Sequence, residues 1–234
     1  MDGPESSDPL VGAREQGLDS LVRQLEGGDL DPRLVAARYS GLRRVRGDGN
    51  CFFRCVMFRV AELAFADRAG ALPAMQKLMR ESLDYLTSAG YDRMAVETFY
   101  EMVVEFFDDE LPAMSALLDV ERAFQDFSRS EHIVWYARAL CAAFMKKNLE
   151  RFEPFLPERY VTVAQYCAAE VEPVGKECEE LEITALCDVL RVRVEIEYLS
   201  SKTRGQEVRN AFGPDDGPVV HLLYRPGHYD VLYR

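Results

Sequence analysis

The sequence predicts an α+β fold in which a small, mostly antiparallel sheet packs between helical regions. Two observations predict this class. Apolar residues recur at helical spacing through most of residues 18–190, whereas regular alternation of apolar and polar residues is clear only after residue 190. In addition, 48% of the 234 residues are hydrophobic, which is enough for one compact core. Helices therefore come first and strands last, without the alternation that builds a parallel sheet.

The N-terminal region offers little to a core. Residues 1–13 are rich in Gly, Pro, Ser, Asp and Glu, so we expect a flexible arm there and a single folded domain over residues 14–234. A short amphipathic helix is predicted to begin at Leu18. A second is predicted to follow Pro32, because proline is favoured in the first turn of a helix.

The middle of the chain is predicted to be helical almost throughout. Its apolar residues recur every three or four positions over residues 51–66, 73–89, 92–107, 130–144, 162–171 and 181–190, with helix and loop mixed at 114–127. Asp92 and Ser130 are the expected N-caps of two of these helices, and Gly90 is the expected stop of another.

The strands are expected at the C-terminal end. Val192–Tyr198 alternates apolar and charged residues, which is typical of a strand with one buried face, and Val208–Phe212 is a weaker candidate. Two terminal strands flank the turn Arg225–His228. Proline at the second position of this turn and glycine at the third favour type II.

A polar loop leads directly into the first long helix. Residues 46–51 read Arg-Gly-Asp-Gly-Asn-Cys, so Cys51 falls in the first helical turn, where unpaired N–H groups and a partial positive charge favour a thiolate. The two glycines allow neighbouring N–H groups to point toward one place and to hold an oxyanion. The pattern indicates a nucleophilic cysteine. The alternative is an ordinary turn followed by a cysteine that belongs to the core.

A candidate base lies in the last strand. Side chains alternate along a strand, so His228 and Asp230 are expected on one face and Tyr229 on the other. The carboxylate can then accept from one imidazole nitrogen and leave the other nitrogen for a thiol. Without Cys51, the same His-x-Asp pattern would be read as a surface ion pair.

Composition excludes several classes of function. The net charge of −12 argues against a nucleic-acid partner, because phosphate binding needs a basic surface. No run of eighteen apolar residues predicts a membrane span, and the first residues lack the features of a signal peptide. The six cysteines form no Cys-x-x-Cys pair, so we expect reduced thiols and a location in the cytoplasm or the nucleus.

A zinc site is an alternative role for the cysteines and histidines of these segments. Cys51, Cys55, His221 and His228 could in principle hold zinc, but their spacing matches no usual zinc pattern. We therefore expect no metal and no other cofactor, with Cys55 as a buried residue of the helix one turn after Cys51.

Three separated blocks of the sequence resemble the otubains, which belong to the ovarian-tumour (OTU) class of deubiquitinating cysteine proteases. They are Gly47–Arg54, Val171–Leu186 and Leu222–Tyr233, and they occur in family order at family-like spacing. The resemblance extends from about Leu18 to the last residue. It implies a papain-like OTU fold and the activity of a thiol protease in the ubiquitin conjugation pathway.

The resemblance also implies a mechanism. Cys51 would attack the carbonyl of the last glycine of ubiquitin in an isopeptide bond, His228 would act as the base, and Asp230 would orient His228. The loop implied to hold the oxyanion comprises Asp48, Gly49 and Asn50, with the N–H groups of Asp48, Gly49 and Cys51 as the main donors.

The implied partners are ubiquitin and polyubiquitin, and ubiquitin-conjugating enzymes are a further candidate. We expect a monomer that binds neither nucleic acid nor membrane. Two alternatives stay open: a non-catalytic regulator that binds ubiquitin or conjugating enzymes, and a general papain-like peptidase. The intact set of Cys51, His228 and Asp230 favours the deubiquitinase.

The sequence departs from the otubain pattern in two places. Glu180 and Glu182 stand where otubains often have histidines, so we expect a more acidic substrate face. The segment before Leu18 is short, and one branch of the family uses a longer arm for a second ubiquitin site and for inhibition of conjugating enzymes. We therefore do not expect that inhibition here.

Overall fold

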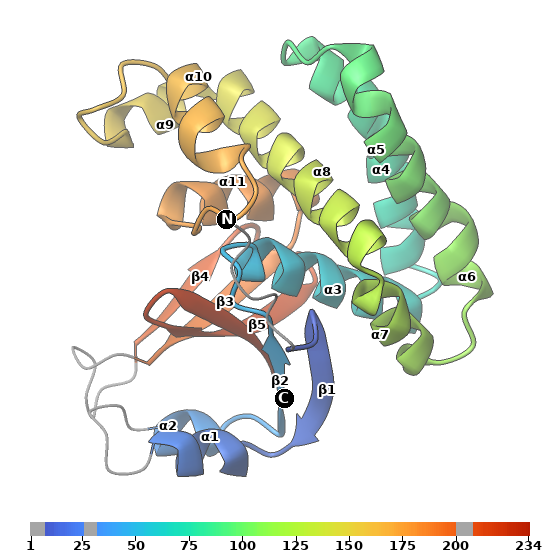
Figure 1. Cartoon of the computed structure of the whole chain (residues 1–234), viewed down its shortest axis with the longest axis vertical. Helices are drawn as coiled ribbons and strands as arrows, with labels where there is room; N and C mark the ends of the chain where they lie inside the picture. Colours follow the sequence, from blue (N-terminus) through green and yellow to red (C-terminus); the bar gives the residue numbers. More distant parts are fainter. Residues whose placement is uncertain (1–7, 26–31, 200–207) are drawn as a thin grey trace.

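The computed structural model describes residues 8–25, 32–199 and 208–234, which form a mixed six-stranded sheet with helices on both sides (Figure 1). The strands are β1 (Val11–Gln16), β2 (Gly41–Val45), β3 (Arg193–Tyr198), β4 (Arg209–Phe212), β5 (Val219–Arg225) and β6 (His228–Tyr233). Their order is β1-β2-β6-β5-β3-β4, and every neighbouring pair is antiparallel except β3 and β5. The predicted α+β class with a mostly antiparallel sheet is confirmed.

Short helices lie between β1 and β2, and longer ones occupy most of the chain between β2 and β3. They are α1 (Asp19–Leu25), α2 (Arg33–Ala36), α3 (Cys51–Ala66), α4 (Ala71–Ser88), α5 (Arg93–Glu105), α6 (Leu111–Ala113), α7 (Leu117–Gln125), α8 (Phe127–Lys147), α9 (Leu149–Phe152), α10 (Val163–Tyr166) and α11 (Glu180–Leu190). π-Helical turns follow α5 and α10, at Phe106–Glu110 and Cys167–Val171, and a 3-10 turn follows α9 at Glu153–Phe155. Within the described residues, no helix is long and apolar enough to cross a bilayer.

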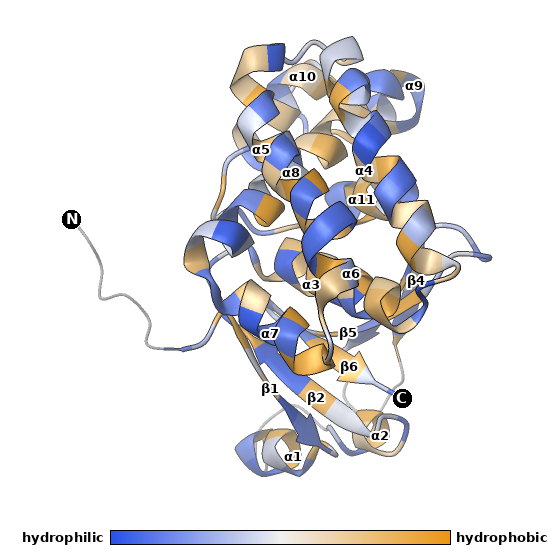
Figure 2. Ribbon diagram, turned by 90° about the vertical axis from the view of Figure 1, so that its right-hand side faces the viewer, coloured by the Kyte–Doolittle hydropathy of each residue, from blue (hydrophilic) through white to orange (hydrophobic). Residues whose placement is uncertain are grey.

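The sheet separates two helical regions of unequal size, as Figures 1 and 2 show. On one face, α1 and α2 cover a small apolar cluster that includes Leu21, Leu42 and Leu232. On the other face, α3 packs against β5 and β6, and α8 packs against α3 and α11. The main core lies in this second region, so α3 is enclosed between the sheet and the other helices.

Helix α3 is buried almost all round. Of its 16 residues, 12 are buried, because apolar side chains such as those of Phe52, Val56 and Val60 occur on nearly every side of the helix. A helix that is buried in this way has a fixed axis. Its first residue, Cys51, is therefore held at a defined place beside β6.

Two strands at the N-terminal end were not predicted. β1 and β2 pair with each other, and β2 also pairs with β6, so the sheet is larger than expected. The pattern of β2 is hidden because Arg43 is buried, with its guanidinium bound by Glu121 of α7 and stacked over the ring of Phe58 in α3. A charged residue in the middle of a strand concealed the alternation on which the prediction relied.

The expected boundary of the N-terminal arm also differs. Residues 1–7 of the predicted arm lie outside the described residues. Within the rest of it, Leu10 and Val11 are buried, and Val11 pairs with Val45 of β2. The folded region thus begins before residue 14.

The helix ends follow local chemistry in most places. Asp92 caps α5 as predicted, with its carboxylate accepting from the N–H of Ala95 at 3.0 Å, and Gly90 follows α4 with a φ of +94°. The predicted cap at Ser130 is wrong. Asp126 caps α8 by accepting from the N–H of Arg129 at 2.8 Å, and Ser130 is buried in the first turn.

Candidate active site

Cys51 is the first residue of α3, as predicted, and Asn50 is its N-cap. The loop before it turns at Gly49, which has a φ of +77°. A side chain at Gly49 would bring its Cβ to 2.1 Å from the carbonyl oxygen of Gly175, so both the backbone angle and the space require glycine. The first N–H groups of α3 have no partner within the helix, and the side chain of the N-cap Asn50 does not cap them.

His228 and Asp230 share one face of β6, as the alternation predicts. The Nε2 atom of His228 lies 3.0 Å from Oδ1 of Asp230, while Tyr229 turns to the other face and packs on Phe52. Asp230 is completely buried and also accepts from the N–H of Val45 at 3.0 Å and from Arg225 at 2.6 Å. Burial raises its pKa, but these bonds outweigh burial and leave the pKa below its ordinary value.

The imidazole of His228 joins Asp230 to Cys51. Hydrogen bonds with Asp230 and with Cys51 raise the pKa of His228 from its ordinary value of 6.5 to about 9, against the opposing effect of burial. The Nδ1 edge of the ring faces the glycine loop, where a Cβ added to Gly47 would lie 3.2 Å from Nδ1. The structure therefore brings together the three residues that the sequence singled out.

The side chains of the loop have bracing roles. Asp48 Oδ1 accepts from the backbone N–H of Asn50 at 2.9 Å and from Arg54 at 2.9 Å. The N–H of Asn50 is thus occupied by the Asp48 side chain, which agrees with its absence from the expected main donors. Within the described part of the chain, no acceptor pairs with the N–H of Gly49 or Cys51.

Two buried arginines, which the sequence analysis missed, hold this loop from behind. Arg54 of α3 binds Asp48 and Glu131, and Arg138 of α8 binds the carbonyl of Gly49 and the side chain of Asn50. Both arginines have no exposed surface. Each interrupts an otherwise apolar stretch of a long helix, and this is the signal in the sequence that could have identified them.

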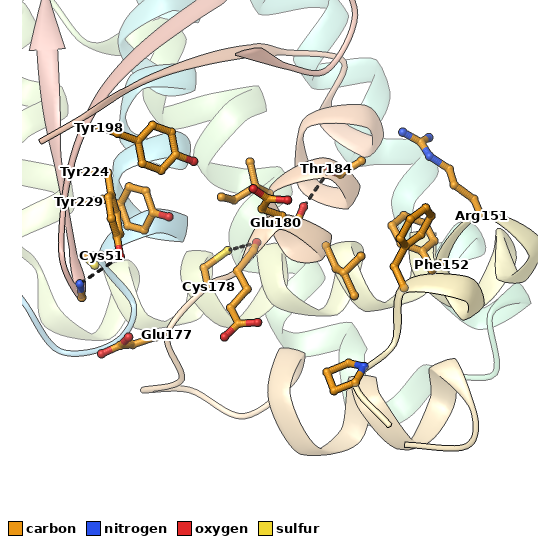
Figure 3. Close-up of a pocket in the computed structure, with 16 residues that line it drawn as sticks. Cys51, Arg151, Phe152, Glu177, Cys178, Glu180, Thr184, Tyr198, Tyr224 and Tyr229 are labelled. Atoms are coloured by element: carbon orange, nitrogen blue, oxygen red, sulfur yellow. Dashed lines mark hydrogen bonds between the residues drawn. The ribbon is translucent and has the colours of Figure 1, made fainter. Parts of the chain in front are cut away.

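A groove with a volume of about 730 Å³ opens beside Cys51 and extends toward Arg151 and Phe152 (Figure 3). Tyr198, Tyr224 and Tyr229 line its wall near Cys51. Carboxylates at Glu177, Glu179 and Glu180 line the segment that leads into α11. Its volume suits a peptide segment, and Cys51 lines one end of it.

The expected acidic face is formed by Glu180 and not by Glu182. Glu180 lines the groove, whereas Glu182 is buried and binds the hydroxyl of Tyr166 and, at 2.9 Å, the N–H of Glu179. Burial raises the pKa of Glu182. Glu182 therefore stabilises the start of α11 and is not available to a substrate.

The four residues of the alternative zinc set do not converge. Cys55 is buried with its thiol 3.6 Å from the carbonyl of Tyr229, and burial raises its pKa well above the ordinary value. His221 packs against the ring of Tyr39, with a distance of 5.5 Å between ring centroids. Among the residues that the structure describes, no group of three or more His, Cys, Asp or Glu side chains is arranged to hold a metal ion.

Residues 8–234 match the family Peptidase C65 Otubain, which is almost the whole chain. The chain belongs to the otubain family. The human ubiquitin thioesterase OTUB1 is 33% identical over 221 residues, which cover 94% of this chain and 79% of that protein. The ovarian-tumour-domain deubiquitinating enzyme 1 of Arabidopsis thaliana is 34% identical over 249 residues, covering 96% of this chain and 81% of that enzyme.

The otubain fold is equally clear in three dimensions. A solved complex of h/ceOTUB1 with ubiquitin aldehyde and UBC13~Ub contains a chain that superposes with a TM-score of 0.89 and 29% identity, covering 98% of this chain and 92% of that chain. A second complex, with UBCH5B~Ub, superposes with a TM-score of 0.88. The family resemblance predicted from the three sequence blocks is confirmed, and the OTU fold with it.

Proposed function

We propose that this otubain is a deubiquitinating cysteine protease that hydrolyses isopeptide bonds at the C-terminus of ubiquitin. The observation that carries the proposal is the pairing of His228 with the buried carboxylate of Asp230 at 3.0 Å, beside the first turn of α3, where Cys51 helps to raise the pKa of His228. This is the order of nucleophile, base and orienting group that acyl transfer requires. The named ubiquitin thioesterases among its relatives support ubiquitin as the acyl group.

In the first step His228 takes the proton of the Cys51 thiol, and the buried Asp230 stabilises the positive charge that His228 then carries. The Cys51 sulfur attacks the carbonyl carbon of the terminal glycine, and the proton on His228 passes to the lysine amine as the C–N bond breaks. Water, deprotonated by the now neutral His228, then hydrolyses the thioester and releases the free carboxylate of ubiquitin.

The tetrahedral intermediates carry an oxyanion. The N–H groups of Asp48, Gly49 and Cys51 are the donors that we propose for it, because none of them is paired with an acceptor in the described part of the chain, whereas the N–H of Asn50 is bound to the Asp48 side chain. Asp48 and Asn50 would contribute by fixing the loop. Arg54 and Arg138 support it from the buried side.

The groove would hold the extended C-terminal tail of ubiquitin. Its tyrosine wall suits apolar side chains, and Glu177, Glu179 and Glu180 suit the basic side chains of such a tail. The solved complexes of h/ceOTUB1 contain ubiquitin aldehyde, which supports ubiquitin as the occupant of the groove. A polyubiquitin chain is the substrate that would present such a tail in an isopeptide bond.

Hydrolysis of isopeptide-linked diubiquitin by the wild type and by Cys51→Ala and His228→Ala tests this function. We expect turnover by the wild type, none by Cys51→Ala, and a rate reduced by about 10²- to 10⁴-fold in His228→Ala, the range for loss of a general base. Ubiquitin binding by Cys51→Ala should persist. Turnover by Cys51→Ala would contradict the assignment, and cleavage of unfolded proteins but not of diubiquitin would indicate a general peptidase.

The second candidate is binding of ubiquitin-conjugating enzymes. The observation that favours it is that the superposable complexes contain UBC13~Ub or UBCH5B~Ub. Binding of ubiquitin-loaded and unloaded conjugating enzymes to Cys51→Ala, measured by calorimetry, tests this candidate. A cytoplasmic or nuclear location is also proposed, and the six free cysteines of the chain support it.

A further inference from the structure

Arg138 is a buried cation that lacks an acidic partner. Its side chain is completely buried in the middle of α8, and among the described residues no carboxylate forms an ion pair with it. Buried guanidinium groups are normally paired, as Arg54 is with Asp48 and Glu131. Burial accordingly lowers the pKa of Arg138. Burying a cation without an ion pair lowers the stability of the fold, so the presence of Arg138 at this position needs a reason other than ion pairing.

The acceptors of Arg138 are neutral oxygens on two separate segments. On the glycine loop, its Nη2 donates to the carbonyl of Gly49 and to Oδ1 of Asn50, both at 2.9 Å. On the segment that leads to the wall of the groove, it donates to the carbonyls of Val171 at 2.9 Å and Lys176 at 2.6 Å. The planar fork of an arginine reaches all four at once, which an ammonium with three donors on one atom does not.

The two segments also touch each other directly. Asn50 Oδ1 accepts from the N–H of Gly175 at 2.8 Å, and Gly49 fits against the carbonyl of Gly175 with no room for a side chain. The ring of Phe53 covers the guanidinium at 4.3 Å and excludes water from it. The loop before Cys51 and the wall of the groove are therefore one rigid unit, with Arg138 at its centre.

We propose that Arg138 is a positioning residue of the active site: it fixes the loop so that the N–H groups of Gly49 and Cys51 point to one place beside the thiol. The role rests on the proposed hydrolase function. It acts through geometry, because the hydrogen-bond partners of the guanidinium among the described residues are oxygens of the loop and of the groove wall and include neither the thiol nor His228. The loss of a well-placed loop should lower the rate of the step that forms an oxyanion and spare reactions of Cys51 that form none.

Arg138→Lys tests the role, since lysine keeps the charge and loses the fork. With ubiquitin bearing a C-terminal fluorogenic amide, we expect kcat to fall by about 10²-fold, the effect of losing one oxyanion donor, with KM changed by less than about threefold. Alkylation of Cys51 by iodoacetamide, quantified by peptide mapping, needs a thiolate and no oxyanion. Its rate at each pH should stay within about twofold of the wild type.

Asn50→Ala provides a second variant in case Arg138→Lys does not fold. It removes the side-chain oxygen that accepts from both Arg138 and Gly175. As with Arg138→Lys, kcat should fall while the rate of Cys51 alkylation stays close to that of the wild type. If both single variants fold, the kcat of the double variant should be no lower than that of the less active single variant, because the two residues act as a unit. Arg43→Lys is the matched control: a buried arginine in β2 that is bound by Glu121, whose loss should lower stability and leave kcat within about twofold.

The outcomes separate the two proposals. An inactive wild type would overturn the proposed hydrolase function and, with it, the role of Arg138. An active wild type with kcat in Arg138→Lys or Asn50→Ala within about threefold of normal would overturn the role of Arg138 alone. A parallel fall of kcat and alkylation rate would also overturn it, because that result indicates general loss of the folded site.

Discussion

Asp230 Oδ1 lies 3.0 Å from Nε2 of His228 inside a site where Asp230 has no exposed surface. The carboxylate is held by three donors, from His228, Val45 and Arg225, so its position does not depend on the histidine alone. The ring of His228 is oriented with Nε2 toward Asp230 and Nδ1 toward the glycine loop. The interaction between these two residues sets the pH range over which the imidazole of His228 stays protonated.

Asp230→Asn should shift the pH profile. The hydrogen bond with Asp230 is the largest cause of the raised pKa of His228, so its weakening moves that pKa from about 9 back toward 6.5. The alkaline limb of kcat/KM, where the imidazolium is lost, should move to lower pH by more than about one unit, and kcat at neutral pH should fall by about 10- to 100-fold. An unchanged limb would mean that another group orients His228.

Gly49→Ala should damage both stability and activity. The left-handed φ of +77° and the 2.1 Å approach to the Gly175 carbonyl add strain and a clash, so we expect a loss of about 3 kcal/mol or more in the free energy of unfolding. Gly17→Ala is the control, because Gly17 has a φ of +73° with open space around its Cβ position and should lose only about 1 kcal/mol. Equal losses in urea unfolding would show that the contact with Gly175 is unimportant.

Glu180→Gln should weaken substrate binding. Glu180 lines the groove and is exposed, and among the described residues its carboxylate forms no ion pair, so it can attract a basic tail. We expect KM for ubiquitin substrates to rise by about two- to tenfold with kcat unchanged, and the difference from wild type to shrink at high salt. Glu101→Gln makes the same charge change on an exposed site of α5, outside the groove. A similar rise in KM for this control would assign the effect to net charge.

His221→Gln should reduce the loss of protein stability at acidic pH. Burial, followed by the charge of Arg234, lowers the pKa of His221 to about 4, while Glu195 opposes them. The imidazole of His221 therefore takes up a proton near pH 6.5 in the unfolded chain but only near pH 4 in the folded protein. As a result, the free energy of unfolding falls as the pH drops through this window. At pH 4.5 the wild type should lose on the order of 2 kcal/mol through this residue, measured as the change in urea midpoint relative to pH 7. An identical pH dependence in the variant would contradict this.

Much of the site was predictable because its chemistry is local. The position of Cys51 follows from a glycine loop that precedes a periodic helix, and the shared face of His228 and Asp230 follows from the alternation of a strand. The turn between β5 and β6 was predictable for the same reason, and Gly227 has the positive φ of 75° that its position requires.

The parts that were missed depend on contacts between distant segments. Arg43 hides the strand pattern of β2 because its partners lie on α3 and α7, and Arg138 supports a loop that is 88 residues away from it in the chain. Glu182 was expected on the substrate face because it stands where otubains often have a histidine, whereas in the fold it is buried and bound by the hydroxyl of Tyr166. A buried charge can be read correctly only when its partners in the fold are known.

The central claim is that Cys51 is the nucleophile for the ubiquitin C-terminus. Ubiquitin carrying a C-terminal thiol-reactive group, incubated with the wild type and with Cys51→Ala and followed by mass mapping of the labelled peptide, tests it most directly. We predict one adduct on Cys51 of the wild type and none on the variant, with the five other cysteines unlabelled because they are buried away from the attacking end of the groove or lack a base. An adduct on another cysteine, or none while ubiquitin still binds, would contradict the claim.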